Sequence, residues 1–438
     1  MKIIVAGAGH GGLTAAALLS AAGHDVSVLE KEKRENLGHD WEDRFTFEIL
    51  REITGQEIPG QSRRYRGDCA FISPDYKTRV VVNYSEENRQ KVMWRKPLLS
   101  MLIENAEKNG VRLSFGEEVL SALVSCGKVV GVETKSGEVF ADLVIDAAGV
   151  FSPVRMSLPA SLGIENAPER GDVFYVRRTY FEKTAEENAE AKAVPFEVYL
   201  CHNGEQGLSW CCTNENSVDI LIGRIDRPDE SLFEKHTKLF CESHPWFGGK
   251  VLHGGTDGVI PVRRPLALMV ADGYAAVGDS AFMTTPMNGM GIDLSLRAGQ
   301  LLAKTVIEEN SADSKALWKY NRDFHRLYGA ETARNESLKN TLLNLPPQGV
   351  SFLFESGVVQ AGDLAGAGRN TKPSVLLGKF VRGMKKPAYF FSVLGGLMKG
   401  AKLSKALATA PEEFEKEKVS AWQNDVKSKV LPVKNEYK

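Results

Sequence analysis

Three glycines near the N-terminus have the spacing of a diphosphate-binding turn. Gly7, Gly9 and Gly12 form a G-x-G-x-x-G motif, which follows an apolar run at 2–6 and precedes a helical run at 13–22. The first glycine permits the turn, the second lets the backbone approach a diphosphate, and the third allows close helix–strand packing. Unpaired N–H groups at the helix start would attract the negative charge. The motif predicts a dinucleotide site, for which FAD and NAD are equal candidates; a glycine-rich turn of another α/β protein is the alternative.

An acidic residue stands where such a site needs one. Glu30 lies eighteen positions beyond Gly12 and ends a second strand-like run at 25–29. Its carboxylate would accept hydrogen bonds from the ribose hydroxyls and would repel a 2′-phosphate. His10 could add a donor to the diphosphate or be an exposed loop residue.

A second motif, at 273–292, favours a flavin. A buried strand ends at Gly278-Asp279, where Asp279 could accept a hydrogen bond from a ribityl hydroxyl. Asn288-Gly289-Met290-Gly291 then opens a helix, whose first amides could face the N1–C2=O edge of an isoalloxazine ring. That edge becomes anionic on reduction, so fixed dipoles there favour reduced flavin.

Two more segments complete a family pattern over residues 1–310: the stretch 147–155 (AAGVFSPVR), and Arg95 before Pro97. With these motifs the chain resembles the FAD-dependent oxidoreductases of the p-hydroxybenzoate-hydroxylase-like superfamily, and within it the geranylgeranyl reductase branch. The resemblance implies non-covalent FAD in an extended pose beneath a substrate layer. The cofactor-binding residues expected are Gly7, Gly9, His10, Gly11, Gly12, Glu30, Lys31, Arg95, Val119, Ala148, Gly149, Gly278, Asp279, Pro286, Gly289, Met290, Gly291 and Ile292.

The sequence also departs from its relatives. Ala148 stands where group A hydroxylases carry an Asp that helps to handle NADPH, which puts classical aromatic hydroxylation in doubt. The Trp segment of the reductases is kept at 207–213, but its Phe-Pro is Cys211-Cys212. Trp210, Cys212 and Met287 are expected to line the substrate, with a core position as the alternative for Trp210. Cys211 is a candidate catalytic thiol, although a buried inert Cys is the commoner fate.

The loop at 38–44 falls where the family places a segment beside the flavin ring. His39 with Asp40 could form a proton donor near flavin N5. The alternative is a solvated charged loop. No metal site is expected.

The elements that would position these residues suggest an α/β fold: a Rossmann-like FAD-binding domain with a β-meander, an inserted antiparallel substrate layer and a helical C-terminus. Helices are predicted at 98–109 and about 290–308, and a meander from runs at 111–115, 118–124, 128–134 and 138–146. The predicted domains are FAD-binding (1–68, 95–165 and 256–345), substrate layer (69–94 and 166–255) and C-terminal helices (346–438).

Composition excludes several classes. Lys+Arg is 55 and Asp+Glu 56, a net charge of 55 − 56 = −1, which argues against nucleic-acid binding. Six Cys without a C-x-x-C spacing argue against a zinc ribbon or a disulfide scaffold, and favour a reducing, cytoplasmic location. No signal peptide and no membrane-spanning apolar run of about 20 residues is evident.

The segment 376–405 holds seven basic and no acidic residues, interleaved with apolar side chains. Peripheral contact with an anionic membrane, a cover over the substrate cavity and a subunit contact are all compatible with it.

The main hypothesis is an FAD-dependent oxidoreductase that reduces a carbon–carbon double bond of a small apolar or isoprenoid-like substrate by hydride from reduced flavin N5. Its electrons would come from NAD(P)H or a ferredoxin-like donor. One alternative is an FAD-dependent monooxygenase acting through a C4a-hydroperoxyflavin. The other is an FAD-containing electron carrier at a membrane surface.

Overall fold

A six-stranded, mainly parallel sheet forms the base of the molecule. The computed structural model describes residues 1–365 and 373–434. The strand order is β18-β19-β12-β1-β2-β8, and only β18 runs antiparallel to its neighbour. Most of these strands are continuous apolar runs because helices cover both faces. Their bounds are β1 Lys2–Ala6, β2 Asp25–Glu30, β8 Arg112–Phe115, β12 Leu143–Asp146, β18 Val270–Ala271 and β19 Tyr274–Ala276.

Helices α1 and α7 pack together unusually closely beside this sheet. A Cβ on Gly299 of α7 would lie 2.4 Å from the carbonyl oxygen of Gly11 in α1, so only glycine fits there. A Cβ on Gly11 would also lie 2.7 Å from the carbonyl oxygen of Ser295 in the first turn of α7, so the two helix starts lie in one region of the fold. The helices of this part are α1 His10–Ala21, α2 Phe47–Thr54, α3 Arg95–Lys108, α4 Pro153–Ser157, α7 Ile292–Glu309 and α8 Ser314–Phe324.

The predicted meander is wrong in its first strand. Strands β9 Val119–Ser125, β10 Lys128–Thr134 and β11 Gly137–Phe140 form an antiparallel three-stranded sheet. The run at 111–115 instead contains β8, which pairs in parallel with β2 at the edge of the main sheet. Short alternating runs do not reveal their partner strand, and the run at 138–146 accordingly divides into β11 and β12.

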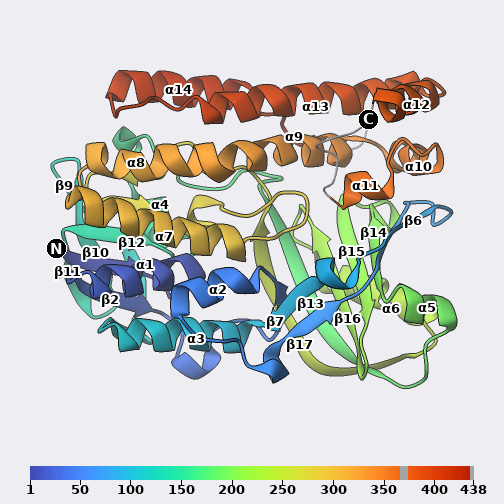
Figure 1. The fold of residues 1–438 in the computed structure, drawn as a ribbon, viewed down its shortest axis with the longest axis horizontal. Helices are drawn as coiled ribbons and strands as arrows, with labels where there is room; N and C mark the ends of the chain where they lie inside the picture. Colours follow the sequence, from blue (N-terminus) through green and yellow to red (C-terminus); the bar gives the residue numbers. More distant parts are fainter. Residues whose placement is uncertain (366–372, 435–438) are drawn as a thin grey trace.

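A second, seven-stranded sheet forms the other half of the molecule (Figure 1). Its order is β17-β13-β16-β15-β14-β5-β6, and it is antiparallel except between β14 and β5. A third, antiparallel sheet has the strand order β3-β7-β4. The bounds are β3 Glu42–Arg44, β4 Arg64–Arg66, β5 Cys69–Ile72, β6 Arg79–Val82, β7 Gln90–Trp94, β13 Val173–Lys183, β14 Phe196–Leu200, β15 Gly207–Thr213, β16 Ser217–Arg224 and β17 Phe247–Pro261, with helices α5 Ala189–Ala193 and α6 Glu230–Ser243.

The C-terminal helices form an outer layer, in which α13 and α14 run along α8 and α9 (Figure 1). None of the helices in the described ranges is long and apolar enough to span a membrane. The bounds are α9 Ala330–Asn344, α10 Pro347–Glu355, α11 Ala361–Leu364, α12 Pro373–Gly383, α13 Pro387–Ala408 and α14 Lys416–Ser428, and a π-helical stretch, His325–Gly329, joins α8 to α9. Short 3₁₀ turns occur at Arg34–Asn36, Gly60–Ser62, Glu86–Asn88, Ala160–Leu162, His202–Gly204 and Gly278–Ala281.

The predicted fold class is confirmed: a parallel α/β base, a meander, an antiparallel layer and C-terminal helices. The domain boundaries remain a prediction. Strand β17 runs continuously across the proposed boundary at 255/256. The predicted region 346–438 includes 366–372 and 435–438, which lie outside the described residues.

Candidate cofactor and substrate site

The glycine turn lies directly against the end of β12. Gly7 has a positive φ of +91°, and a Cβ there would lie 2.6 Å from the carbonyl oxygen of Ala147. A Cβ on Gly12 would lie 2.5 Å from the Cβ of Ala147. Gly9 precedes α1, which has no side-chain cap and no acidic residue in its first turn. The start of α1 therefore offers unsatisfied N–H groups beside a backbone that leaves no room for side chains.

His10 places an unpaired polar atom at this helix start. Its Nε2 is buried and has no hydrogen-bond partner among the described residues. Burial lowers the pKa of His10 to about 4, with a further contribution from Arg95. The ring is therefore neutral near pH 7. An unsatisfied buried nitrogen is costly, and a ligand group that pairs with it would remove the cost.

Glu30 is held rigidly at the end of β2. One carboxylate oxygen accepts a hydrogen bond from the amide of Ala8 at 2.7 Å, and the other accepts from the amide of Glu32 at 2.8 Å. Each oxygen keeps a second lone pair for ribose hydroxyls. The amide of Glu117 donates to the carbonyl of Glu30, which brings the chain leading to Val119 beside it, while Lys31 is exposed.

The segment 147–155 is tied to the second motif. The amide of Gly149 donates to Ser280 Oγ at 2.8 Å, and the buried Arg155 donates to the carbonyls of Ser280 and Val150. Ser152 donates to Asp146 at 2.6 Å and accepts from the amide of Arg155. Ser152 and Arg155 thus hold this loop to the sheet, and Ala148 stays exposed at its tip.

The loop before α7 is closed on itself. Thr285 pairs with Met290 through both its amide and its hydroxyl, each at 2.9 Å. Gly289 has a φ of +67°, and a Cβ there would lie 3.4 Å from Ile260 of β17. Helix α7 follows Gly291 and, like α1, has no side-chain cap. In this loop Pro286 and Ile292 are buried, and Met287, Gly289, Met290 and Gly291 are half-buried.

Asp279 follows Gly278 at the end of β19. Its carboxylate accepts from Thr284 Oγ1 at 3.1 Å. Burial raises the pKa of Asp279, and this outweighs the opposite effects of the Thr284 hydrogen bond and of the charge of Arg95. The three segments expected to contact the cofactor, near Gly9, Arg95 and Asp279, thus lie within electrostatic range of one another.

The sequence did not reveal the partner of Arg95. Arg95 donates to Asp43 of β3 at 2.6 and 2.8 Å. Burial opposes the charge of Asp43, but the Arg95 guanidinium outweighs it and holds the pKa of that carboxyl below its usual value. Arg95 also lies 5.5 Å from the ring centre of Trp41, which stacks on His39 at 4.1 Å.

The predicted His39–Asp40 pair is not a pair in the structure. Burial, then Arg95, lowers the pKa of His39 to about 4, so it is neutral near pH 7. The carboxylate of Asp40 instead lies 3.4 Å from Nδ1 of His253. His253 stacks on Tyr180 at 4.3 Å and contacts the edge of Trp94. Nothing in the local sequence around His253 signals this contact, because it joins β17 to a loop far away in the sequence.

Trp210 and Cys212 lie on one face of the seven-stranded sheet, the face on which Trp41 packs. Trp210 meets Phe196 edge-on at 5.8 Å, and its indole N–H is buried without a described partner. It belongs to an apolar cluster with Trp41 and Ile260, and Ile260 also lies against the loop at Gly289. Cys212 is buried on the same face, and burial raises the pKa of its thiol to about 11.

Cys211 is a correction to the predicted site. It points to the other face of the sheet, where it packs in a cluster with Ile220, Phe181 and Phe240 of α6. Adjacent strand residues alternate in direction, so Cys211 and Trp210 cannot share a face. Burial raises the pKa of Cys211 well above its usual value, which suppresses the reactive thiolate.

A buried ion cluster joins the loop at 38–44 to the seven-stranded sheet. Arg178 donates to both carboxylate oxygens of Asp219 and to the carbonyl of Glu42. Arg66 also pairs with Asp219, at 3.1 Å. The side chain of Arg178 lies 5.5 Å from the ring centre of Trp210. These contacts hold β3, and with it Asp43, in a set position relative to the aromatic face.

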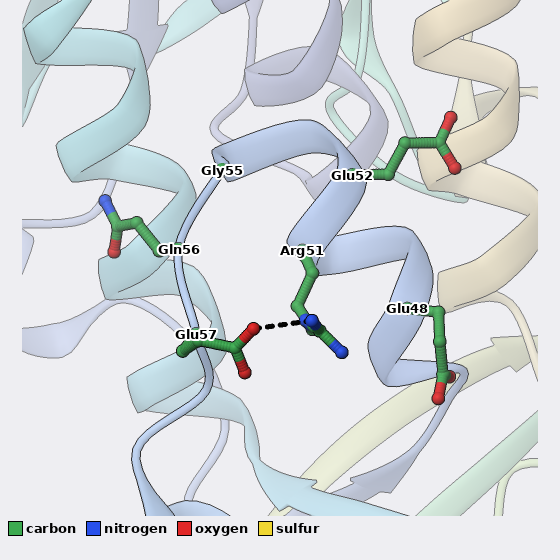
Figure 2. Close-up of a pocket in the computed structure, with 6 residues that line it drawn as sticks. All are labelled: Glu48, Arg51, Glu52, Gly55, Gln56 and Glu57. Atoms are coloured by element: carbon green, nitrogen blue, oxygen red, sulfur yellow. Dashed lines mark ion pairs between the residues drawn. The ribbon is translucent and has the colours of Figure 1, made fainter.

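A surface depression of about 350 Å³ is lined by other residues (Figure 2). Its wall includes an ion pair of 2.5 Å between Arg51 and Glu57. It contains no residue of the predicted site, and its mixed charges give no indication of a ligand. The lining residues are Glu48, Arg51, Glu52, Gly55, Gln56 and Glu57.

Comparison with known proteins gives concordant similarities. A protein family described as "FAD binding domain" matches residues 1–334. The digeranylgeranylglycerophospholipid reductase of Haloferax volcanii is 25% identical over 391 residues, which cover 79% of this chain and 90% of that protein.

Solved structures share the fold. A geranylgeranyl bacteriochlorophyll reductase-like protein from Thermoplasma acidophilum superposes with a TM-score of 0.71 at 18% identity, covering 90% of this chain and 98% of that one. The protein pqsL of Pseudomonas aeruginosa, described as a probable FAD-dependent monooxygenase, has a TM-score of 0.57 at 19% identity, covering 81% and 99%. The resemblance inferred from the sequence motifs is confirmed.

Proposed function

Since the chain belongs to the FAD binding domain family, we propose that this FAD-dependent oxidoreductase reduces a carbon–carbon double bond of an apolar, isoprenoid-like substrate. The cofactor predicted from the sequence, FAD, is confirmed by the family match over residues 1–334. The type of reaction and the substrate are the proposal. Its main support is the juxtaposition of an aromatic, apolar sheet face with the loop that precedes α7, through Ile260 and Gly289.

The described residues fit FAD. Two helix starts without side-chain caps, at α1 and α7, suit the diphosphate and the electron-rich edge of the ring, respectively. The unpaired Nε2 of His10 and the side-chain-free path past Gly9 suit the diphosphate. Glu30 suits the ribose, and Asp279 the ribityl chain. When bound and reduced, FAD supplies a hydride; the protein provides binding, orientation and exclusion of water.

The residues above this site suit an apolar substrate. Trp41, Trp210 and Ile260 give an aromatic and aliphatic surface. Arg178 lies beside Trp210 on the same face, and its charge is paired with Asp219. Such a surface would hold a hydrocarbon chain and keep water from the reacting carbons. The digeranylgeranylglycerophospholipid reductases to which the chain is similar carry a name consistent with this substrate class.

Reduction of a double bond also needs a proton. His39 is neutral near pH 7 because of its lowered pKa, so we assign it the role of orienting Trp41, on which it stacks. The neighbouring pair of Asp40 and His253 is the proposed donor, since the imidazole lies 3.4 Å from the carboxylate and a positioned His is the commonest proton-transfer group in enzymes. NAD(P)H or a ferredoxin-like protein is the proposed electron source.

Anaerobic turnover tests this function. Purified protein carrying FAD is reduced chemically, mixed with a geranylgeranyl lipid without oxygen, and followed by flavin absorbance and by mass spectrometry of the lipid. We expect flavin reoxidation with a gain of two hydrogen atoms in the lipid. Turnover that requires oxygen and adds an oxygen atom would establish a monooxygenase instead. Reversible flavin reduction without any substrate-dependent reoxidation would establish an electron carrier.

A further inference from the structure

Helices α12 and α13 form a hairpin on the outside of the molecule. Phe390 at the start of α13 packs on Gly383 at the end of α12, where a Cβ would lie 2.2 Å from its ring. Phe380 meets the same ring edge-on at 5.8 Å. Figure 1 shows α13 in the outermost layer, with α12 at one end of it.

Helix α13 is fixed by a small-residue face. A Cβ on Gly396 would lie 2.0 Å from Thr341 Oγ1 of α9, and one on Gly400 would lie 3.0 Å from the carbonyl of Arg334. Leu403 and Leu407 continue this buried face. At 100° per residue, the opposite face of the helix carries Phe391, Leu394, Met398, Lys402 and Lys405, all of them exposed. The exposed face is therefore set by the close packing on α9.

The hairpin exposes much more apolar surface than the rest of the chain. Of twenty exposed large hydrophobic residues among those described, nine lie within 376–398. Leu377 is 65% exposed and Val381 63%. Isolated exposed hydrophobic residues are ordinary, whereas a contiguous group marks an interaction surface. The nine are Leu376, Leu377, Phe380, Val381, Met384, Phe391, Leu394, Leu397 and Met398.

Positive charge surrounds this apolar surface. The segment 376–405 has a charge of +7, while the whole chain has −1, so the remainder carries −8. Lys379 pairs with Asp363. In contrast, Lys385, Lys399, Lys402 and Lys405 form no ion pair with any other residue in the described ranges. Lys385 lies in the turn between the helices, and the other three lie on the C-terminal half of α13.

We propose that the α12–α13 hairpin docks this protein on an anionic lipid membrane, with its apolar side chains in the interface and its lysines on the lipid headgroups. Apolar side chains flanked by unpaired lysines are typical of interfacial helices that lie on a membrane without crossing it. A second copy of the chain is a poor occupant, because a symmetric contact would bring two sets of seven positive charges together. The inference goes beyond the proposed reaction, and gives the enzyme a source of lipid substrate.

Vesicle sedimentation of the FAD-loaded protein tests the proposal without any turnover. The vesicles are phosphatidylcholine alone, or phosphatidylcholine with phosphatidylserine, at low and at high salt. We expect binding to the mixed vesicles at low salt, and at least about tenfold weaker binding at high salt, because salt screens the lysines. Absence of binding at low salt, or equal and salt-independent binding to neutral vesicles, would overturn the proposal.

Two sets of variants assign the binding to the hairpin. The triple variant Lys399→Glu, Lys402→Glu, Lys405→Glu is compared with Lys33→Glu, Lys77→Glu, Lys250→Glu, which changes the net charge equally at other exposed sites. The triple variant Leu377→Ser, Val381→Ser, Met398→Ser is compared with Leu120→Ser, Val124→Ser, Phe140→Ser on the meander. We expect at least about tenfold weaker vesicle binding for the first member of each pair only.

The oligomeric state provides the last outcome. If the Leu377/Val381/Met398 variant converts a dimer to a monomer while the wild-type protein ignores vesicles, the hairpin is a contact between copies and the membrane proposal is wrong. FAD content and lipid reduction in detergent solution are measured in parallel. A failure of the proposed reaction would appear only in those measurements, and a failure of membrane docking only in sedimentation.

Discussion

Arg95 and Asp43 form a bidentate ion pair, with N···O distances of 2.6 and 2.8 Å, that joins the start of α3 to strand β3. The two residues are fifty-two positions apart, and each lies among groups expected to contact the cofactor. Asp43 orients the guanidinium, and the neighbouring strand contact through Arg178 and Glu42 holds Asp43 in place. The pair thus connects β3, which Arg178 ties to the seven-stranded sheet, to the start of α3, where Arg95 is proposed to support the diphosphate.

Replacement of Asp43 by Asn should weaken both stability and FAD binding. The guanidinium of Arg95 would lose its charged partner, at a cost of about 1.5–3 kcal/mol in the free energy of unfolding. FAD affinity should fall by about tenfold or more, because Arg95 is no longer oriented. Urea unfolding and fluorescence titration with FAD measure the two effects. The control is Arg34→Met, which breaks an exposed pair with Glu107 and should cost about 0–1 kcal/mol without affecting FAD.

Gly9→Ala should leave the fold intact and weaken FAD binding. Gly9 has an ordinary φ of −70°, so alanine causes no backbone strain, yet its Cβ would occupy the approach beside Ala147. We expect FAD affinity to fall by at least about tenfold, which is about 1.4 kcal/mol. The circular dichroism of the apoprotein should be unchanged. Gly60→Ala, where no atom lies within 4 Å of the new Cβ, is the control and should retain full FAD content.

His253→Gln should slow the chemical step while FAD stays bound. If the Asp40–His253 pair delivers the proton, single-turnover flavin reoxidation by the lipid should slow by about 10²–10⁴-fold. Stopped-flow absorbance gives this rate directly. His24→Gln, at the far end of the first helix, should behave as the wild type. An unchanged reoxidation rate in His253→Gln would remove the pair from the mechanism.

His325 should make the protein sensitive to acid. It is fully buried, and burial lowers its pKa from 6.5 to about 4. Between pH 6.5 and about pH 4 the unfolded chain therefore binds a proton at His325 that the folded protein does not bind. Stability is complete above about pH 6.5 and falls as the pH drops towards 4, by about 3 kcal/mol in total for this group. His325→Gln, which can keep the hydrogen bond to Ala267, should show a smaller loss between pH 7 and 4.5 in urea unfolding.

Cys211→Ala should leave turnover within about twofold of the wild type. The thiol lies on the face of the seven-stranded sheet that packs on α6, away from Trp210. Loss of its buried sulfur should cost about 1 kcal/mol in stability. Thiol labelling of the native protein should modify the exposed Cys126 and spare Cys211. A large loss of turnover with normal FAD content would restore Cys211 to the site.

Much of the cofactor-binding half was predictable from sequence. The turn from Gly7 to Gly12, the strand ending at Glu30 and the start of α7 after Gly291 are each encoded within about thirty residues. Local hydrophobic period and glycine spacing suffice for such units, because their contacts are close in sequence. The family match over residues 1–334 agrees with that reading.

Contacts between distant segments were decided only by the tertiary structure. β8 joined the parallel sheet, Asp40 paired with His253, Asp43 with Arg95, and Cys211 turned towards α6. No local pattern predicts which sheet edge a short strand will join, or which face of a strand will point towards the cofactor. Those choices follow from the burial of whole faces. The apolar side chains of a sheet are buried, and its buried charges are paired, only when all the layers have assembled.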